Sequence, residues 1–154
     1  MNLDVDLPNA ASTETLGRRL AAGLPTTPGG LLMTLSGELG AGKSSLVRAF
    51  LHALGHEGPV PSPTYTLVEP YVIDNHNFYH VDLYRIGGPD EIEFLGWDDI
   101  RLGTVLVEWP ERVARLAPSA DLAIELAYQD AGRRASMRAQ SPQGKEWLES
   151  VRMT

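Results

Sequence analysis

The residues best suited to chemistry lie in the segment GELGAGKSSL, residues 37–46. It fits the phosphate-binding pattern G-x-x-x-x-G-K-[ST], whose fixed positions are Gly37, Gly42, Lys43 and Ser44. Backbone N–H groups in such a loop form an anion-binding nest at the start of a helix, and the helix dipole adds to the attraction. The lysine reaches the β- and γ-phosphates, and the final hydroxyl binds Mg²⁺. The segment therefore predicts a nucleotide-binding site.

The lysine of this pattern is unusual for the chain, which has two lysines and eleven arginines. Because the chain uses arginine much more often than lysine, a position that needed only a positive charge would be expected to hold arginine. Contact with the β- and γ-phosphates needs a compact ammonium instead. Lysine at position 43 thus favours a functional phosphate loop over a chance match.

A nucleotide hydrolase also needs a carboxylate at the end of a buried strand, to hold Mg²⁺ directly or through water. Glu108 ends the apolar run VLVE, and Asp82 lies in YHVDLYR, where polar and apolar residues alternate. We expect Glu108 to bind the metal and Asp82 to act on the attacking water, although the pattern leaves the reverse assignment open. Thr64, in the loop segment SPTYT, is a candidate sensor of the γ-phosphate.

The flanking sequence predicts the strand and the helix that a phosphate loop requires. LLMTL, residues 31–35, is a continuous apolar run typical of a strand buried on both faces. Residues 44–54 predict a helix that ends at Gly55. An earlier helix is expected over residues 12–24, capped by Ser12 or Thr13 and broken by the segment TTPGG, residues 26–30.

The rest of the chain alternates between predicted strands and helices. Further strands are expected at 61–72, 77–86 and 104–109. Helices are expected from Pro89, over 110–117 and over 141–151. DLAIELAY and RRASMRAQ, separated by QDAG, predict a C-terminal β-hairpin. We therefore expect a single domain over residues 1–154, of α/β class, with a mixed and largely parallel sheet flanked by helices.

Composition narrows the function classes. The 154-residue chain is 43% hydrophobic and 21% charged, as in ordinary globular proteins. It has no cysteine, which excludes disulfides and cysteine-based zinc sites, and its four histidines lack metal-ligand spacing, so we assign them no role. The acidic N-terminus is unlike a secretory signal, and no apolar run approaches the ~20 residues of a membrane span. A net charge of −7 argues against broad, unaided nucleic-acid binding. We expect a cytoplasmic protein without a membrane partner.

Five segments occur in order and at close spacing: GELGAGKSSLVRAF, SPTYTLVEPY, YHVDLYR, EFLGWDD and LVEWPER. Together they resemble the TsaE (YjeE) family of bacterial ATPases, over nearly the whole chain. The resemblance implies a P-loop α/β domain that binds ATP and Mg²⁺ and is needed to make N6-threonylcarbamoyladenosine beside the anticodon of tRNA. Such proteins do not transfer the group. They bind TsaD, which does, together with its paralogue TsaB, and they meet tRNA only through that complex.

The resemblance also implies roles for individual residues. The phosphates would be held by nine consecutive residues, Gly37, Glu38, Leu39, Gly40, Ala41, Gly42, Lys43, Ser44 and Ser45. Ser44 and Glu108 would hold Mg²⁺, Asp82 would be needed for hydrolysis, and Thr64 would lie near the γ-phosphate. Thr13 and Arg133 match family positions near the nucleotide. The family often has threonine at position 44, and serine retains the hydroxyl.

Two other functions fit a phosphate loop: a small-molecule P-loop kinase and a nucleotide-gated adaptor with little hydrolysis. A kinase needs an acceptor pocket and an arginine-bearing lid, and no compact arginine-rich lid is evident in the sequence. Fast hydrolysis usually needs an arginine on the γ-phosphate, and the sequence assigns that role to no residue. We therefore expect slow hydrolysis that partner proteins regulate, with the acidic run Asp90–Asp99 as a candidate docking surface.

Overall fold

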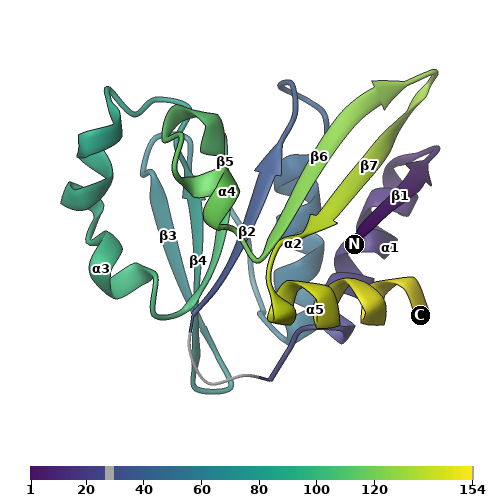
Figure 1. The fold of residues 1–154 in the computed structure, drawn as a ribbon, viewed down its shortest axis with the longest axis horizontal. Helices are drawn as coiled ribbons and strands as arrows, with labels where there is room; N and C mark the ends of the chain where they lie inside the picture. The colour runs from purple at the N-terminus through teal and green to yellow at the C-terminus, as the bar shows by residue number, and fades with distance from the viewer. Residues whose placement is uncertain (27–29, 154) are drawn as a thin grey trace.

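Within the described residues, 1–26 and 30–153, the computed structural model of the chain contains one seven-stranded sheet (Figure 1). Its strands are β1 (Asn2–Leu7), β2 (Leu31–Ser36), β3 (Val68–Ile73), β4 (His76–Asp82), β5 (Thr104–Glu108), β6 (Leu122–Gln129) and β7 (Gly132–Ala139). Their order is β1-β7-β6-β2-β5-β4-β3. The central strands β6, β2, β5 and β4 are parallel, whereas the β1–β7, β7–β6 and β4–β3 pairs are antiparallel. The α/β class, the mixed sheet and the C-terminal hairpin are confirmed.

Helices cover both faces of this sheet. The α-helices are α1 (Ala10–Ala22), α2 (Lys43–Leu54), α3 (Trp97–Ile100), α4 (Leu116–Ser119) and α5 (Pro142–Met153). Two 3₁₀ helices are η1 (Pro89–Leu95) and η2 (Pro110–Arg112). Apolar residues of α1, α2 and α5 form the larger core on one face, and residues of η1, α3 and α4 form a smaller core on the other (Figure 1). No helix among the described residues is long and apolar enough to cross a membrane.

The alternation of side chains along the strands decides which polar residues face α2. In β5, Leu106 belongs to the larger core, while Val105 and Val107 belong to the smaller one. Because successive side chains point to opposite faces, Glu108 shares the face of Leu106. The same rule places His80 and Asp82 on that face in β4. The carboxyl ends of β4 and β5 thus present polar side chains toward the helix that follows the phosphate loop.

Strand β1 is a feature that the sequence reading missed. It pairs antiparallel with β7 at the edge of the sheet, and its sequence NLDVDL alternates apolar and polar residues. Such alternation is typical of a half-buried strand and could have identified it. The predicted cap of the next helix was also wrong. Asn9, and neither Ser12 nor Thr13, caps α1, and its Oδ1 accepts a hydrogen bond from the Ser12 N–H at 3.0 Å.

Three predicted boundaries were also wrong. The strand expected over 61–72 begins only at Val68, because Pro61 and Pro63 lack an N–H for the sheet and the Leu67 N–H closes a turn onto the Pro63 oxygen at 2.7 Å. The strand expected over 77–86 ends at Asp82. The helix expected over 110–117 is only a 3₁₀ turn followed by α4, since Val113 is extended and buried in the smaller core. The expected helix break falls largely on residues 27–29, outside the described residues.

Candidate nucleotide-binding site

Buried polar and charged side chains gather where β4 and β5 end and α2 begins. In the described part of the chain, the polar or charged residues that are at most 5% exposed are Thr13, Thr34, Lys43, His80, Asp82 and Glu108. Lys43 is the first residue of α2, and Asp82 and Glu108 are register partners at the ends of their strands. Burying a charge costs several kcal/mol unless partners compensate for it, so this concentration makes the region a candidate functional site.

Glycines give the predicted phosphate loop its conformation. Gly37 has φ 147°, and a Cβ there would lie 2.4 Å from the Leu126 oxygen, so no other residue fits without a shift. Gly42 has φ 105° and stands directly before α2. The first N–H groups of a helix have no carbonyl one turn earlier to bind, and they carry the positive end of its dipole. The loop therefore presents backbone donors suited to phosphate oxygens.

The Lys43 ammonium is held inside this loop. Its Nζ donates to the Gly37 oxygen at 2.5 Å and lies 3.6 Å from the centre of the Trp109 ring. Burial lowers the pKa of Lys43 below its ordinary value, and the nearby carboxylates of Glu108, Glu111 and Asp82 offset part of that shift. The site thus surrounds one buried cation with more than one carboxylate, an arrangement that favours a second cation.

Ser44 and Glu108 fit the requirements of Mg²⁺. Ser44 Oγ donates to Glu108 Oε2 at 3.0 Å. Ligands on adjacent corners of a magnesium octahedron, with bonds of ~2.1 Å, lie ~3.0 Å apart, which matches this pair. Among the described residues, no cluster of three or more His, Cys, Asp or Glu could hold a metal. Mg²⁺ usually takes one or two protein ligands and completes its shell with water and phosphate.

Asp82 has a different set of partners. Its Oδ2 accepts a hydrogen bond from Thr64 Oγ1 at 3.2 Å, and its Oδ1 accepts one from the Tyr84 N–H at 2.8 Å. Ser62 Oγ lies 2.9 Å from Thr64 Oγ1 and extends this group. The structure therefore brings Thr64 to Asp82, as two members of one cluster beside the loop. It joins Ser44 to Glu108 instead, which favours Glu108 as the metal ligand.

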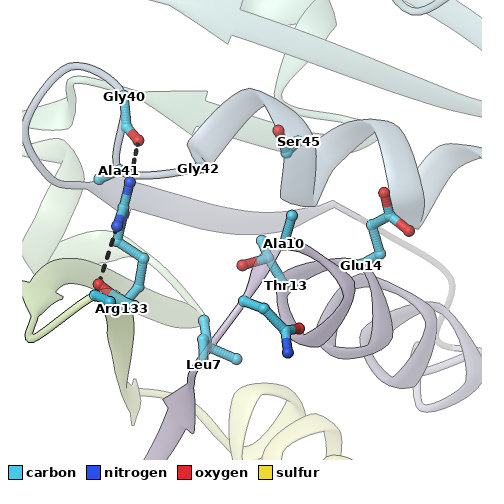
Figure 2. A pocket seen from close by; sticks show the side chains of 12 residues that line it. Leu7, Ala10, Thr13, Glu14, Gly40, Ala41, Gly42, Ser45 and Arg133 are labelled. Carbon is cyan, nitrogen blue, oxygen red and sulfur yellow. Dashed lines mark hydrogen bonds between the residues drawn. The ribbon is translucent and has the colours of Figure 1, made fainter.

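A cleft of about 260 Å³ adjoins the loop (Figure 2). Its walls include Thr13 from α1 and Arg133 from β7, together with the loop residues Gly40, Ala41 and Gly42, and Ser45 of α2. Arg133 donates to the Gly40 oxygen at 3.1 Å and stacks on the Tyr128 ring at 4.0 Å. Tyr128 in turn donates to the Leu39 oxygen at 2.8 Å. The C-terminal hairpin is thereby tied to the tip of the loop.

The predicted site residues differ in what they can contribute. Glu38 and Leu39 are exposed, Leu39 at 64%, and their backbone oxygens accept hydrogen bonds from the Ala41 N–H and the Tyr128 hydroxyl. His80 was given no role in the sequence reading, yet its Nε2 lies 2.5 Å from Glu108 Oε2. A signal was available, since His80 precedes Asp82 by two positions and thus shares its face of the strand. Trp109, a residue of positive φ (59°), also lies at the site, against Lys43.

Comparisons with known proteins agree with one another. The family model described as threonylcarbamoyl adenosine biosynthesis protein TsaE matches residues 7–136. The chain is 43% identical over 117 residues to the tRNA threonylcarbamoyladenosine biosynthesis protein TsaE of Haemophilus influenzae, covering 75% of this chain and 74% of that protein. It is 40% identical over 121 residues to the protein of the same name from a Synechocystis species, covering 75% of this chain and 74% of that one.

A solved structure gives the same result at the level of the fold. The crystal structure of YdiB from Bacillus subtilis is similar with a TM-score of 0.78 and 26% sequence identity, covering 99% of this chain and 95% of that chain. The family match spans most of the chain, including the phosphate loop and the strands that carry the buried carboxylates. The chain therefore belongs to the TsaE family, whose role is in the biosynthesis of tRNA threonylcarbamoyladenosine.

Proposed function

We propose that this protein is a Mg²⁺-dependent ATPase that binds and hydrolyses ATP in complex with TsaB–TsaD and does not itself transfer the threonylcarbamoyl group. The observation that carries the proposal is the buried group at the start of α2, where Lys43 lies in the loop and Ser44 Oγ is 3.0 Å from Glu108 Oε2. A kinase would need an acceptor pocket as well. The cleft of about 260 Å³ beside the loop is bounded by the loop itself and would receive part of the nucleotide.

The residues divide the work of binding among them. Lys43 and the backbone N–H groups of residues 37–45 would hold the phosphates. Ser44 and Glu108 would hold Mg²⁺, which when bound neutralises charge on the β- and γ-phosphate oxygens. Thr13 and Arg133 line the cleft that would receive the rest of the nucleotide.

Asp82 and Thr64 would act on the attacking water and the γ-phosphate. Their 3.2 Å hydrogen bond, together with the 2.8 Å bond from the Tyr84 N–H, fixes the Asp82 carboxylate. A fixed carboxylate can orient a water molecule and accept a hydrogen bond from it. This division leaves Asp82 free of the metal and gives it a role in turnover.

The placement of three arginines near the site supports slow turnover without partners. Arg133 is bound to the Gly40 oxygen, Arg85 lies 4.6 Å from the Tyr65 ring, and Arg112 lies 5.3 Å from the Tyr84 ring. Each is engaged with the protein itself, whereas an arginine on the γ-phosphate is worth ~10³–10⁵ in rate. We propose that TsaB–TsaD supplies or orders the arginine that acts on the γ-phosphate.

We also propose that the protein contacts tRNA only through this complex, and that it works in the cytoplasm.

The fate of the γ-phosphate tests the proposal. The protein is incubated with Mg²⁺, ATP labelled at the γ-phosphate and a mixture of small-molecule acceptors, both without and with TsaB–TsaD. ADP, inorganic phosphate and the position of the label are measured, with Glu108→Gln as the matched control. We expect equal amounts of ADP and free phosphate, and neither from the variant. ADP without free phosphate, with label on a small acceptor, would indicate a kinase. Tight ATP binding without any ADP, even with TsaB–TsaD present, would indicate an adaptor.

A further inference from the structure

His80 is a buried polar residue that the proposed function does not use. It is 1% exposed, and its Nε2 lies 2.5 Å from Glu108 Oε2. Its other ring nitrogen, Nδ1, is buried and finds no hydrogen-bond partner among the described residues. Leaving a polar atom unpaired in a protein interior is costly, so the hydrogen bond of the other ring nitrogen, Nε2, is the contact that this imidazole contributes.

The pairing also determines which nitrogen carries the proton. A carboxylate oxygen can only accept, so Nε2 must donate to Glu108 Oε2. His80 therefore presents one fixed donor, its Nε2–H, to Glu108.

The strands hold this donor in place. His80 is the register partner of Leu106, and Asp82 is the partner of Glu108, so His80 and Glu108 are diagonal neighbours on one face of the β4–β5 pair. Glu108 Oε2 accepts from Ser44 Oγ at 3.0 Å as well as from His80. The same oxygen is thus held from α2 on one side and from β4 on the other.

We propose that His80 is a positioning residue of the metal site, whose Nε2–H holds the Glu108 carboxylate in the orientation that faces Ser44. The inference rests on the proposed function, because it takes Glu108 as the Mg²⁺ ligand. A hydrogen bond to a metal-binding side chain orients that side chain before the metal binds, so less conformational entropy is lost on binding. Removing the hydrogen-bonding residue typically costs 10–100-fold in metal affinity. The effect on nucleotide binding is confined to the part that depends on Mg²⁺.

A pair of amide variants isolates the hydrogen bond. In His80→Gln the side-chain NH₂ reaches the position of the histidine Nε2, whereas in His80→Asn it reaches only that of Nδ1. The two variants share their chemistry and differ in reach. The affinity for a non-hydrolysable ATP analogue is measured by calorimetry with Mg²⁺ and again with EDTA, and thermal melting of each variant establishes that it is folded.

We expect wild type and His80→Gln to bind the analogue with Mg²⁺ within about 3-fold of each other. We expect His80→Asn to bind it about 10–100-fold more weakly with Mg²⁺ and unchanged with EDTA. If His80→Asn keeps the full Mg²⁺ effect, or loses affinity equally in EDTA, the positioning role is refuted while the proposed function stands. His80→Leu, which fills the space without a donor, is expected to behave as His80→Asn, and it decides the question if the buried amide unfolds the protein. Wild type that shows no Mg²⁺ effect would overturn both proposals.

Discussion

Replacing Lys43 by methionine removes the one charge that the phosphate loop directs at its ligand. Methionine keeps an unbranched side chain of similar length beside Trp109, so packing changes little. The chain supplies its own control. Lys145, the other lysine, is exposed on α5, and Lys145→Met makes the same chemical change away from the site.

The expected loss of ATP-binding free energy depends on the contacts that the Lys43 ammonium has without ATP and on those it gains with ATP. Removing one partner of a buried charge pair costs ~2–5 kcal/mol of binding energy. Lys43 already has a charged hydrogen bond to the Gly37 oxygen and a cation–π contact with Trp109, and part of this is given up when it turns to a phosphate. We therefore expect the lower end, about 2–3 kcal/mol, which is about 30- to 150-fold in Kd.

Calorimetric titration of ATP into the two variants measures this difference, and thermal unfolding without nucleotide measures their stability. Lys43→Met should bind ATP about 30- to 150-fold more weakly than wild type. Its melting temperature should lie within a few degrees of wild type, because removing the buried charge removes both its desolvation cost and its attraction to nearby carboxylates, and the two effects oppose each other. Lys145→Met should match wild type in both. ATP affinity within 3-fold of wild type in a folded Lys43→Met protein would refute the phosphate-loop assignment.

Three further outcomes are expected. Glu108→Gln should lose both hydrolysis and the part of ATP binding that depends on Mg²⁺. Asp82→Asn should bind Mg²⁺ and ATP normally but hydrolyse ATP at least 10-fold more slowly. Calorimetric titration measures the binding and phosphate release measures the hydrolysis, and the opposite pattern would exchange the two roles. Because Trp109 lies against Lys43, wild-type tryptophan fluorescence should change on ATP binding, and Trp109→Phe should abolish that change. The Kd for ATP should shift less than 10-fold, since phenylalanine retains a ring for Lys43. An undiminished fluorescence change would mean that another tryptophan reports the binding. Because burial lowers the pKa of Lys43, the unfolded chain binds more protons than the folded chain between that lowered pKa and the ordinary one, so the free energy of unfolding should rise with pH in that interval. Denaturant unfolding should show this rise in wild type relative to Lys43→Met, and parallel pH profiles would contradict it.

The parts of the site that lie close together in the sequence were predictable. The phosphate loop is continuous from Gly37 to Ser44, and its flanking strand and helix follow from apolar periodicity, so position and structure could be inferred together. Glu108 was identified because it ends an apolar run, and Asp82 because it lies in a strand-forming segment of alternating polar and apolar residues. That the strand ends at Asp82 came only from the structure. The sequence left their division of labour open, and the contacts of Ser44 and Thr64 now favour one assignment.

Other features depended on contacts between distant segments. His80 pairs with Glu108 across 28 positions, and this pairing follows from the β4–β5 register, which periodicity alone does not give. Tyr128 reaches the Leu39 oxygen across 89 positions, through the C-terminal hairpin. The helix expected after β5 does not form, because Trp109 adopts a left-handed conformation and Val113 is extended and buried in the smaller core. Burial there outweighed helix propensity.

The most direct test of the proposed mechanism is steady-state ATP turnover by the purified protein, measured alone, with tRNA, with TsaB–TsaD, and with all of them together. Because the arginines Arg133, Arg85 and Arg112 are engaged with the protein itself, hydrolysis should be slow alone and unchanged by tRNA. Addition of TsaB–TsaD should change the rate several-fold, and Glu108→Gln should remove the activity in every mixture. Rapid hydrolysis by the isolated protein, at a rate indifferent to TsaB–TsaD, would contradict the mechanism.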